Sequence, residues 1–137
     1  RTLALSSLAG MPVLVLYEDK NSAEQNLAFK RELSELAKDG AYKRSIALVA
    51  VADVGAYDYW PIRGFVKSAI RDESAKFKTV IYCDWNGEAR GALSVRPGVS
   101  NVVLYGKDGK ALFAHEGAMA PETRKALVDL LKSQIDK

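Results

Sequence analysis

Apolar residues occur in blocks along this chain, and their spacing differs from one block to the next. Two short and nearly continuous apolar runs, Met11–Tyr17 and Ser45–Asp53, are typical of strands that are buried on both faces of a sheet. Each run is followed by a segment whose apolar residues recur at helical spacing. The first predicted helix continues to about Asp39, where Gly40 ends it, and the second covers Arg63–Asp72. The chain therefore begins with two strand–helix units.

The second half of the sequence predicts a further strand, a hairpin and a last helix. In chain order these elements are the strand Thr79–Trp85, a short helix or irregular segment at Ala89–Leu93, the hairpin strands Asn101–Tyr105 and Lys110–His115, and a helix that begins at Pro121. Strands that alternate with helices pair in parallel through right-handed crossovers, whereas a hairpin adds antiparallel strands. We therefore expect a single α/β domain over residues 1–137 with a thioredoxin-like layout. Its central mixed sheet has helices on both faces, and a β-hairpin and a helix complete the chain.

Several motifs, in their order and spacing, resemble the YtfJ family of bacterial proteins. The stretch Asn86–Leu131 has a strand, Lys-Asp-Gly-Lys, a second strand, Glu-Gly-Ala and a helix that starts with proline. Upstream, Tyr59–Ile70 and Leu8–Gly10 match two further segments of that family. Ala120 and Leu93 depart from it, at positions where the family often has Ser or Thr and Trp. The resemblance implies a thioredoxin-like fold related to the peroxiredoxin group and a periplasmic location.

Composition excludes several classes of function. The 137 residues include 20 Lys and Arg and 17 Asp and Glu, scattered without a basic run, so we expect no nucleic-acid binding. No apolar run approaches the roughly 20 residues of a membrane span, and residues 1–10 are too polar for the core of a signal peptide. One cysteine, Cys83, and one histidine, His115, exclude an internal disulfide and a multi-thiolate metal site. We expect no metal and no cofactor, and the oligomeric state remains open.

The turn after the first strand is where thioredoxin-like enzymes carry their reactive thiol, at the start of a helix that lowers its pKa. No cysteine lies in Asp19–Ser22, and Ser22 with Gln25 predicts a capping box instead. The position that faces this turn, a cis-proline in thioredoxins, is Ser100, for which we expect a trans peptide bond. The candidate partner-binding residues along this edge are Asp19, Lys20, Asn21, Ser22, Ser100 and Asn101.

Two further candidate sites follow from single residues. Asp53 ends a strand at the carboxyl edge of the sheet, where it either lines a cleft with Tyr57 and Trp60 or caps the next turn. Cys83 lies within a strand, where a free cysteine is usually a small buried side chain, and we expect Asp84 to raise its pKa. A reactive thiol at Cys83 is the alternative.

These observations support three hypotheses. The leading hypothesis is a redox-inactive thioredoxin-like domain of the bacterial cell envelope that binds a peptide or protein partner at the former active-site edge. The second is an enzyme, a thiol-dependent oxidoreductase or peroxidase that uses Cys83. The third is a structural or assembly role, for example a homodimer through an exposed sheet edge.

Overall fold

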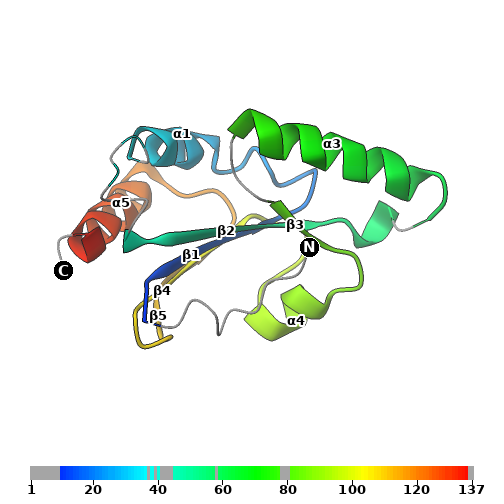
Figure 1. Cartoon of the computed structure of the whole chain (residues 1–137). Helices are drawn as coiled ribbons and strands as arrows, with labels where there is room; N and C mark the ends of the chain where they lie inside the picture. The colour runs from blue at the N-terminus through cyan, green and yellow to red at the C-terminus, as the bar shows by residue number, and fades with distance from the viewer. Residues whose placement is uncertain are drawn as a thin grey trace.

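The computed structural model describes residues 10–36, 38, 40, 45–57, 59–77 and 81–135. Its elements are β1 (Val13–Glu18), α1 (Leu27–Leu36), β2 (Ala47–Asp53), the 3-10 helix η2 (Gly55–Tyr57), α3 (Ile62–Phe77), β3 (Ile81–Asp84), α4 (Glu88–Leu93), β4 (Asn101–Tyr105), β5 (Ala111–Glu116) and α5 (Pro121–Ile135) (Figure 1). The predicted order of elements is confirmed, and the segment at residues 89–93 is helical. The predicted end of the first helix at Asp39 lies outside the described residues.

The five strands form one mixed sheet in the order β3-β2-β1-β4-β5. Strands β1, β2 and β3 are parallel, whereas β4 runs antiparallel to β1 and β5 antiparallel to β4. In the central strand, Val15 lies opposite Val49 on one side and Val103 on the other. Five of the six residues of β1 are buried, as its continuous apolar run predicts.

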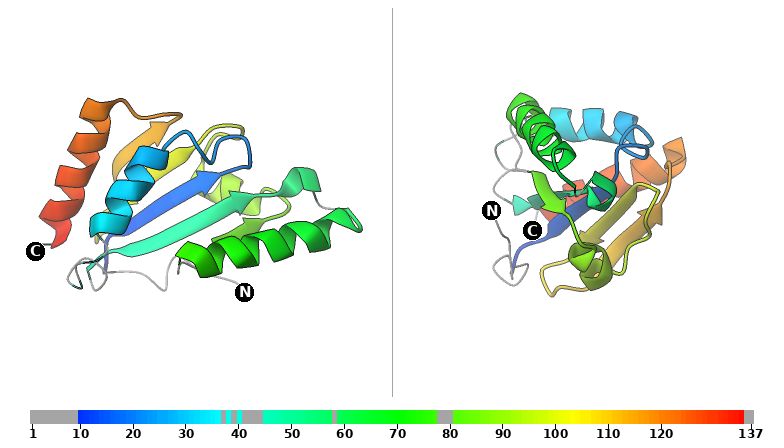
Figure 2. Two further views of the ribbon diagram at one scale, coloured as in Figure 1. Left: turned by 90° about the horizontal axis from the view of Figure 1, so that it is seen from above. Right: turned by 90° about the vertical axis from the view of Figure 1, so that its right-hand side faces the viewer.

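Helices cover both faces of the sheet, as predicted. Helices α1, α3 and α5 lie on one face and α4 on the other (Figures 1 and 2). The α1/α5 side holds the larger core, in which Phe29 and Leu33 of α1 and Leu127 and Leu131 of α5 pack on the even-numbered residues of β1 and β4. The opposite face carries Val13, Val15 and Tyr17 together with Ala89 and Leu93 of α4.

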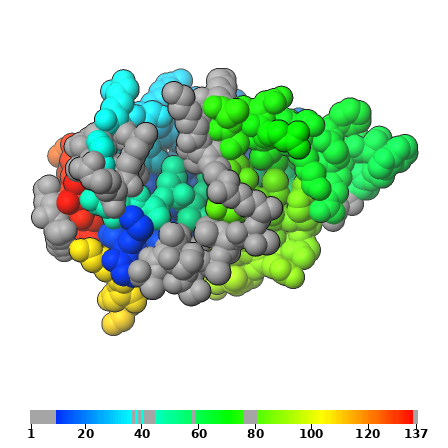
Figure 3. All heavy atoms as spheres, viewed as in Figure 1, coloured from blue at the N-terminus to red at the C-terminus, as the bar shows by residue number. Residues whose placement is uncertain are grey.

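Helix α3 differs from the other long helices because none of its residues 62–75, the part whose burial is described, is buried. It continues to Phe77, five residues beyond the predicted end at Asp72. Phe65 on its first turns is 69% exposed, while the Arg63 guanidinium lies 4.4 Å from the centre of the Trp85 ring. Helix α3 and the residues before it form the tapering right-hand end of the face in Figure 3. This end of the molecule therefore presents apolar side chains to solvent.

Candidate functional site

The turn that follows β1 is fixed by a reciprocal pair of hydrogen bonds. The Ser22 amide donates to Asp19 Oδ1 at 2.8 Å, and the Asp19 amide donates to Ser22 Oγ at 2.9 Å. This reciprocal pair fixes the turn before α1, which begins only at Leu27, and the predicted Ser22–Gln25 capping box is wrong. Gln25 instead accepts a hydrogen bond from the Ser100 amide at 2.8 Å. The Ser100 amide is buried and needs a hydrogen-bond acceptor. A local capping motif in the sequence cannot show that Gln25 is needed for this distant contact.

Asn26, at the beginning of α1, joins three parts of the chain. Its Nδ2 group donates to Ser100 Oγ at 2.9 Å and to the Gly117 carbonyl at 3.0 Å, while Oδ1 accepts from the Met119 amide at 2.8 Å. Its side chain is only 3% exposed. Asn26 thus ties α1 to the loops on either side of the β4–β5 hairpin, and sequence reasoning did not single it out.

Ser100 and Asn101 extend the group of buried, hydrogen-bonded side chains that includes Asn26. The Ser100 hydroxyl donates to Glu18 Oε2 at 2.6 Å, and Glu18 in turn pairs with Lys30 at 2.5 Å. Asn101 Nδ2 donates to the Arg96 carbonyl at 2.6 Å. We call Ser22, Asn26, Ser100 and Asn101, all buried, the buried polar cluster. Among the described residues the only cis peptide bond is Trp60–Pro61, so the bond before Ser100 is trans as predicted.

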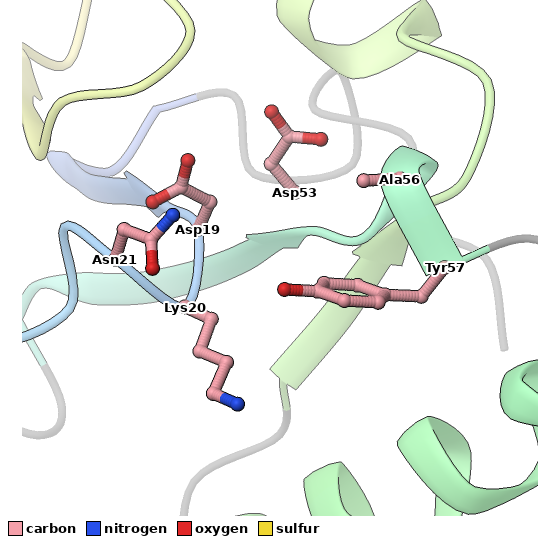
Figure 4. A pocket seen from close by; sticks show the side chains of 6 residues that line it. All are labelled: Asp19, Lys20, Asn21, Asp53, Ala56 and Tyr57. Atoms are coloured by element: carbon pink, nitrogen blue, oxygen red, sulfur yellow. The ribbon is translucent and has the colours of Figure 1, made fainter.

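A shallow pocket of about 100 Å³ opens beside this cluster (Figure 4). Its lining residues are Asp19, Lys20, Asn21, Asp53, Ala56 and Tyr57. They come from the turn after β1 and the connection after β2, because the carboxyl ends of parallel strands share one edge of the sheet. In Figure 4 the Asp19 and Asp53 carboxylates lie on the same side of the opening, the Tyr57 hydroxyl projects toward its middle, and the Lys20 side chain extends away from both carboxylates.

The candidate residues that the sequence singled out fall into two groups, those that line the pocket and those that are buried. Asp19, Lys20 and Asn21 line the same pocket as Asp53 and Tyr57. The side chains of Ser22, Ser100 and Asn101 are buried instead, so they support the edge from beneath and cannot themselves contact a partner. Trp60 is 91% exposed and lies outside the pocket lining.

Asp53 both lines the pocket and caps the next turn, the two alternatives that the sequence left open. Its Oδ1 atom accepts from the Gly55 amide at 3.4 Å, a long bond that caps the turn of η2. Its Oδ2 atom lies 3.8 Å from Arg90 Nη1 at the start of α4. Neither contact is short, and the side chain remains part of the pocket wall.

A second carboxylate, Asp84, lies directly opposite Asp53 in the β2–β3 register, but it is buried. The Tyr17 hydroxyl donates to Asp84 Oδ2 at 2.6 Å, and the amides of Gly87 and Arg90 donate to the same carboxylate at 2.9 and 3.0 Å. Sequence reasoning missed this pair, although Tyr17 ends one predicted strand and Asp84 is the next-to-last residue of another.

The environment shifts the pKa of both partners. Burial, the hydrogen bond to Asp84 and the nearby Asp53 charge raise the pKa of Tyr17, so its hydroxyl stays protonated. Burial would raise the pKa of Asp84, but the hydrogen bonds from Tyr17 and from the amides of α4 outweigh it and hold that pKa below its usual value. Asp84 is therefore a structural carboxylate.

Cys83 is half-buried on the other face of β3. Burial raises the pKa of its thiol, and the positive charges of Lys67 and Arg63 on α3 only partly oppose this effect. The predicted direction is thus found, but the predicted cause is wrong: Asp84 makes no contribution, because its carboxylate is turned toward Tyr17. An elevated pKa is the opposite of what a reactive thiol requires.

The remaining candidate for metal or acid–base chemistry is His115. Its Nε2 atom lies 3.1 Å from the Ala118 carbonyl, and its ring stacks on Phe113 with centroids 6.4 Å apart. Within the described ranges, no three His, Cys, Asp or Glu side chains gather closely enough to hold a metal ion. In the same part of the chain, no helix is long and apolar enough to span a membrane.

The arrangement of strands and helices is that of a thioredoxin-like fold, and solved structures agree. The chain superimposes on the exposed lipoprotein thioredoxin Etrx1 of Streptococcus pneumoniae strain TIGR4 with a TM-score of 0.66 and 20% identity, over 97% of this chain and 92% of that one. For a putative thiol:disulfide interchange protein DsbE of Chlorobium tepidum the TM-score is 0.64 at 21% identity, over 96% and 84% of the two chains. A secreted disulfide oxidoreductase of Mycobacterium tuberculosis, homologous to E. coli DsbE, gives 0.61 at 18% identity, over 93% and 85%.

The family can be assigned more narrowly than the fold. The YtfJ family model, described as a bacterial protein of unknown function, matches residues 24–134. The chain therefore belongs to the YtfJ family, as the motifs between Tyr59 and Leu131 indicated. No curated protein matches the chain.

Proposed function

We propose that this protein is a redox-inactive thioredoxin-like domain of the bacterial cell envelope that binds a peptide or protein partner at the pocket between the β1–α1 and β2–α3 connections. The observation that carries the proposal is the pocket itself. It lies at the carboxyl edge of the parallel strands, where α/β folds bind their ligands. The pocket is open, whereas the adjoining polar side chains are buried and hydrogen-bonded.

The chemistry of the pocket suits a peptide better than a small apolar molecule. Carboxylates, an amide, an ammonium group and a phenol line it, and Lys20 and Asn21 are exposed. Such groups donate to and accept from backbone amides and polar side chains of an extended chain. The reciprocal Asp19–Ser22 bonds hold the turn in one conformation, which lowers the entropy cost of binding.

The loss of thiol chemistry rests on three observations. The turn at the start of α1 contains no cysteine, the single cysteine of the chain has no partner for an internal disulfide, and burial raises the pKa of that thiol. These features oppose the alternative of a thiol-dependent enzyme that acts through Cys83.

The envelope location draws support from relatives of the fold. Two of the proteins with similar structures are an exposed lipoprotein and a secreted oxidoreductase. Fractionation of cells that express the natural full-length protein tests this part of the proposal, and recovery of the protein only in the cytosol would contradict it.

Partner binding is tested by heteronuclear NMR during titration with a mixed peptide library. We expect amide shifts at Lys20, Asn21 and Tyr57, and a Tyr57→Ala variant should weaken binding by about tenfold through loss of ring contacts. Lys107→Ala, on the exposed hairpin turn, is the matched control and should bind as the wild type does. Shifts confined to residues remote from the pocket would overturn the proposal.

The absence of redox chemistry is tested by alkylation of Cys83 as a function of pH. We expect slow modification in the native protein, with a midpoint above that of a free thiol, and rapid modification once the protein unfolds. Rapid alkylation of the folded protein near neutral pH would instead favour the enzyme.

A further inference from the structure

Exposed apolar side chains concentrate beside the pocket. Among the described residues, five large hydrophobic side chains are exposed, and three of them fall within residues 59–65, the end of the loop before α3 and the first turn of that helix. These three are Tyr59, Trp60 and Phe65, at 57%, 91% and 69% exposure, and we call them the aromatic patch. Isolated exposed apolar residues are ordinary on a protein surface, whereas a group of aromatic ones marks a contact surface.

The aromatic patch follows the pocket wall along the chain. Tyr57 lines the pocket, and the Tyr59 amide donates to the Tyr57 carbonyl at 2.9 Å, so the backbone of Tyr59 lies one tight turn beyond the pocket wall. The next turn is held by a hydrogen bond of 2.9 Å from the Arg63 amide to the Tyr59 carbonyl. We expect a ligand that leaves the pocket along this connection to reach Tyr59 and Trp60.

The charge of the pocket indicates which kind of ligand side chain would enter it. Asp19 and Asp53 both contribute carboxylates to the lining, and Asp53 has a long ion pair with Arg90 at 3.8 Å. Among the described lining residues Lys20 is the one cation, and its side chain extends away from the two carboxylates (Figure 4). The Tyr57 ring adds an aromatic surface on which a cation is stabilised. The opening between these groups therefore favours a positively charged side chain.

We propose that the partner is an extended peptide segment in which a lysine or arginine side chain enters the pocket between Asp19, Asp53 and Tyr57, while an apolar side chain one or two residues away packs on Trp60. This inference rests on the proposed function, since it names the chemistry of the partner that the pocket binds. It requires the polar pocket and the aromatic patch to act together, whereas partner binding alone requires only the pocket.

A double-mutant cycle between peptide and protein tests both contacts. The probes are four capped pentapeptides with glycine at the other positions. They carry Lys and Leu, acetyl-lysine and Leu, Lys and Gly, or Glu and Leu, and their affinities are measured by NMR titration. We expect the Lys–Leu peptide to bind about fivefold to tenfold more tightly than either peptide that lacks one of the two side chains. The Glu–Leu peptide should bind most weakly of the four.

The protein variants assign each contact to its residue. With Asp53→Asn, the preference for lysine over acetyl-lysine should fall by about fivefold while the preference for leucine over glycine is kept. With Trp60→Ala, the leucine preference should disappear and the lysine preference remain. The matched control Leu112→Ala, an exposed apolar residue on β5, should change neither preference.

The outcomes separate this inference from the proposed function. If pocket resonances shift but the lysine and acetyl-lysine peptides bind equally, or the Glu–Leu peptide binds best, the cationic assignment is overturned and partner binding stands. If Trp60→Ala leaves the leucine preference unchanged, the role of the aromatic patch is overturned. If neither these peptides nor the mixed library shift pocket resonances, both the inference and the proposed function fail.

Discussion

Two pairs of like residues at the same edge of the sheet have opposite environments. Asn26 is buried with three hydrogen bonds, whereas Asn21, five residues earlier, is exposed in the pocket wall. Asp84 is buried with donors from Tyr17 and two backbone amides, whereas Asp53, opposite it in the strand register, has two long contacts within the described residues. This edge of the sheet is therefore divided into a buried part that maintains the fold and an exposed part that lines the pocket.

The first pair gives the largest expected difference. Asn26→Ala removes three buried hydrogen bonds and leaves the Met119 amide without an acceptor, so we expect the free energy of unfolding to fall by about 3 kcal/mol. Asn21→Ala should change it by less than about 0.5 kcal/mol. Urea unfolding of both variants measures the contrast, and equal losses would show that the division between the two parts is wrong.

The second pair should behave in the same way with a smaller difference. Asp84→Asn keeps the size of the side chain but replaces one acceptor oxygen by a donor that faces the amides of α4 or the Tyr17 hydroxyl, at a cost of about 2 kcal/mol. Asp53→Asn should stay within about 0.5 kcal/mol of the wild type. A larger loss at Asp53 than at Asp84 would contradict the comparison.

The dependence of stability on pH sharpens this contrast between the carboxylates. The pKa of Asp84 is lower in the folded protein than in the unfolded chain, so its contribution is present above the unfolded value and is lost as the pH falls through the folded value. Wild-type stability should thus decline below about pH 4. The Asp84→Asn variant should decline less steeply over the same range in urea unfolding series, and a slope equal to that of the wild type would contradict this role of Asp84.

The smallest effect concerns the turn that joins the two parts. Ser22→Ala removes the acceptor of the Asp19 amide and should cost about 1 kcal/mol, the ordinary loss for a capping side chain. Ser34→Ala, on the exposed side of α1, provides the control and should change stability by less than about 0.5 kcal/mol. If Ser22→Ala were equally neutral, the turn would not depend on the reciprocal bonds.

Local signals in the sequence predicted most of the fold. The continuous apolar run of β1, the Gly106–Gly109 turn and the start of α5 at Pro121 each depend on neighbouring residues, and each prediction is confirmed. The end of α3 was wrong because the apolar spacing fades after Asp72 while helix formers continue to Phe77. A helix with no buried residue gives little periodicity by which its length can be judged.

The site was predictable only where it depends on the position of a strand end. Asp53 was found because it ends a strand at the carboxyl edge of the sheet, and Asp19, Lys20 and Asn21 because they lie in the turn where thioredoxin-like enzymes carry their thiol. The Tyr17–Asp84 bond joins residues 67 positions apart on strands that are not neighbours in the sheet. The change of Gln25 from a cap to an acceptor for Ser100 likewise depends on tertiary packing, which a local pattern does not contain.

The position of most of the pocket wall outside the strand ladders has an evolutionary consequence. Apart from Asp53 at the end of β2, its walls belong to two connections, so substitutions at Lys20, Asn21 or Tyr57 leave strand pairing and both cores untouched. Variation in ligand preference can then accumulate at little cost in folding, while the residues beneath the pocket remain constrained. Related proteins with this fold can therefore change their binding partners through substitutions in one connection at a time. The same two connections are a suitable place to randomise residues when new binding specificities are to be selected.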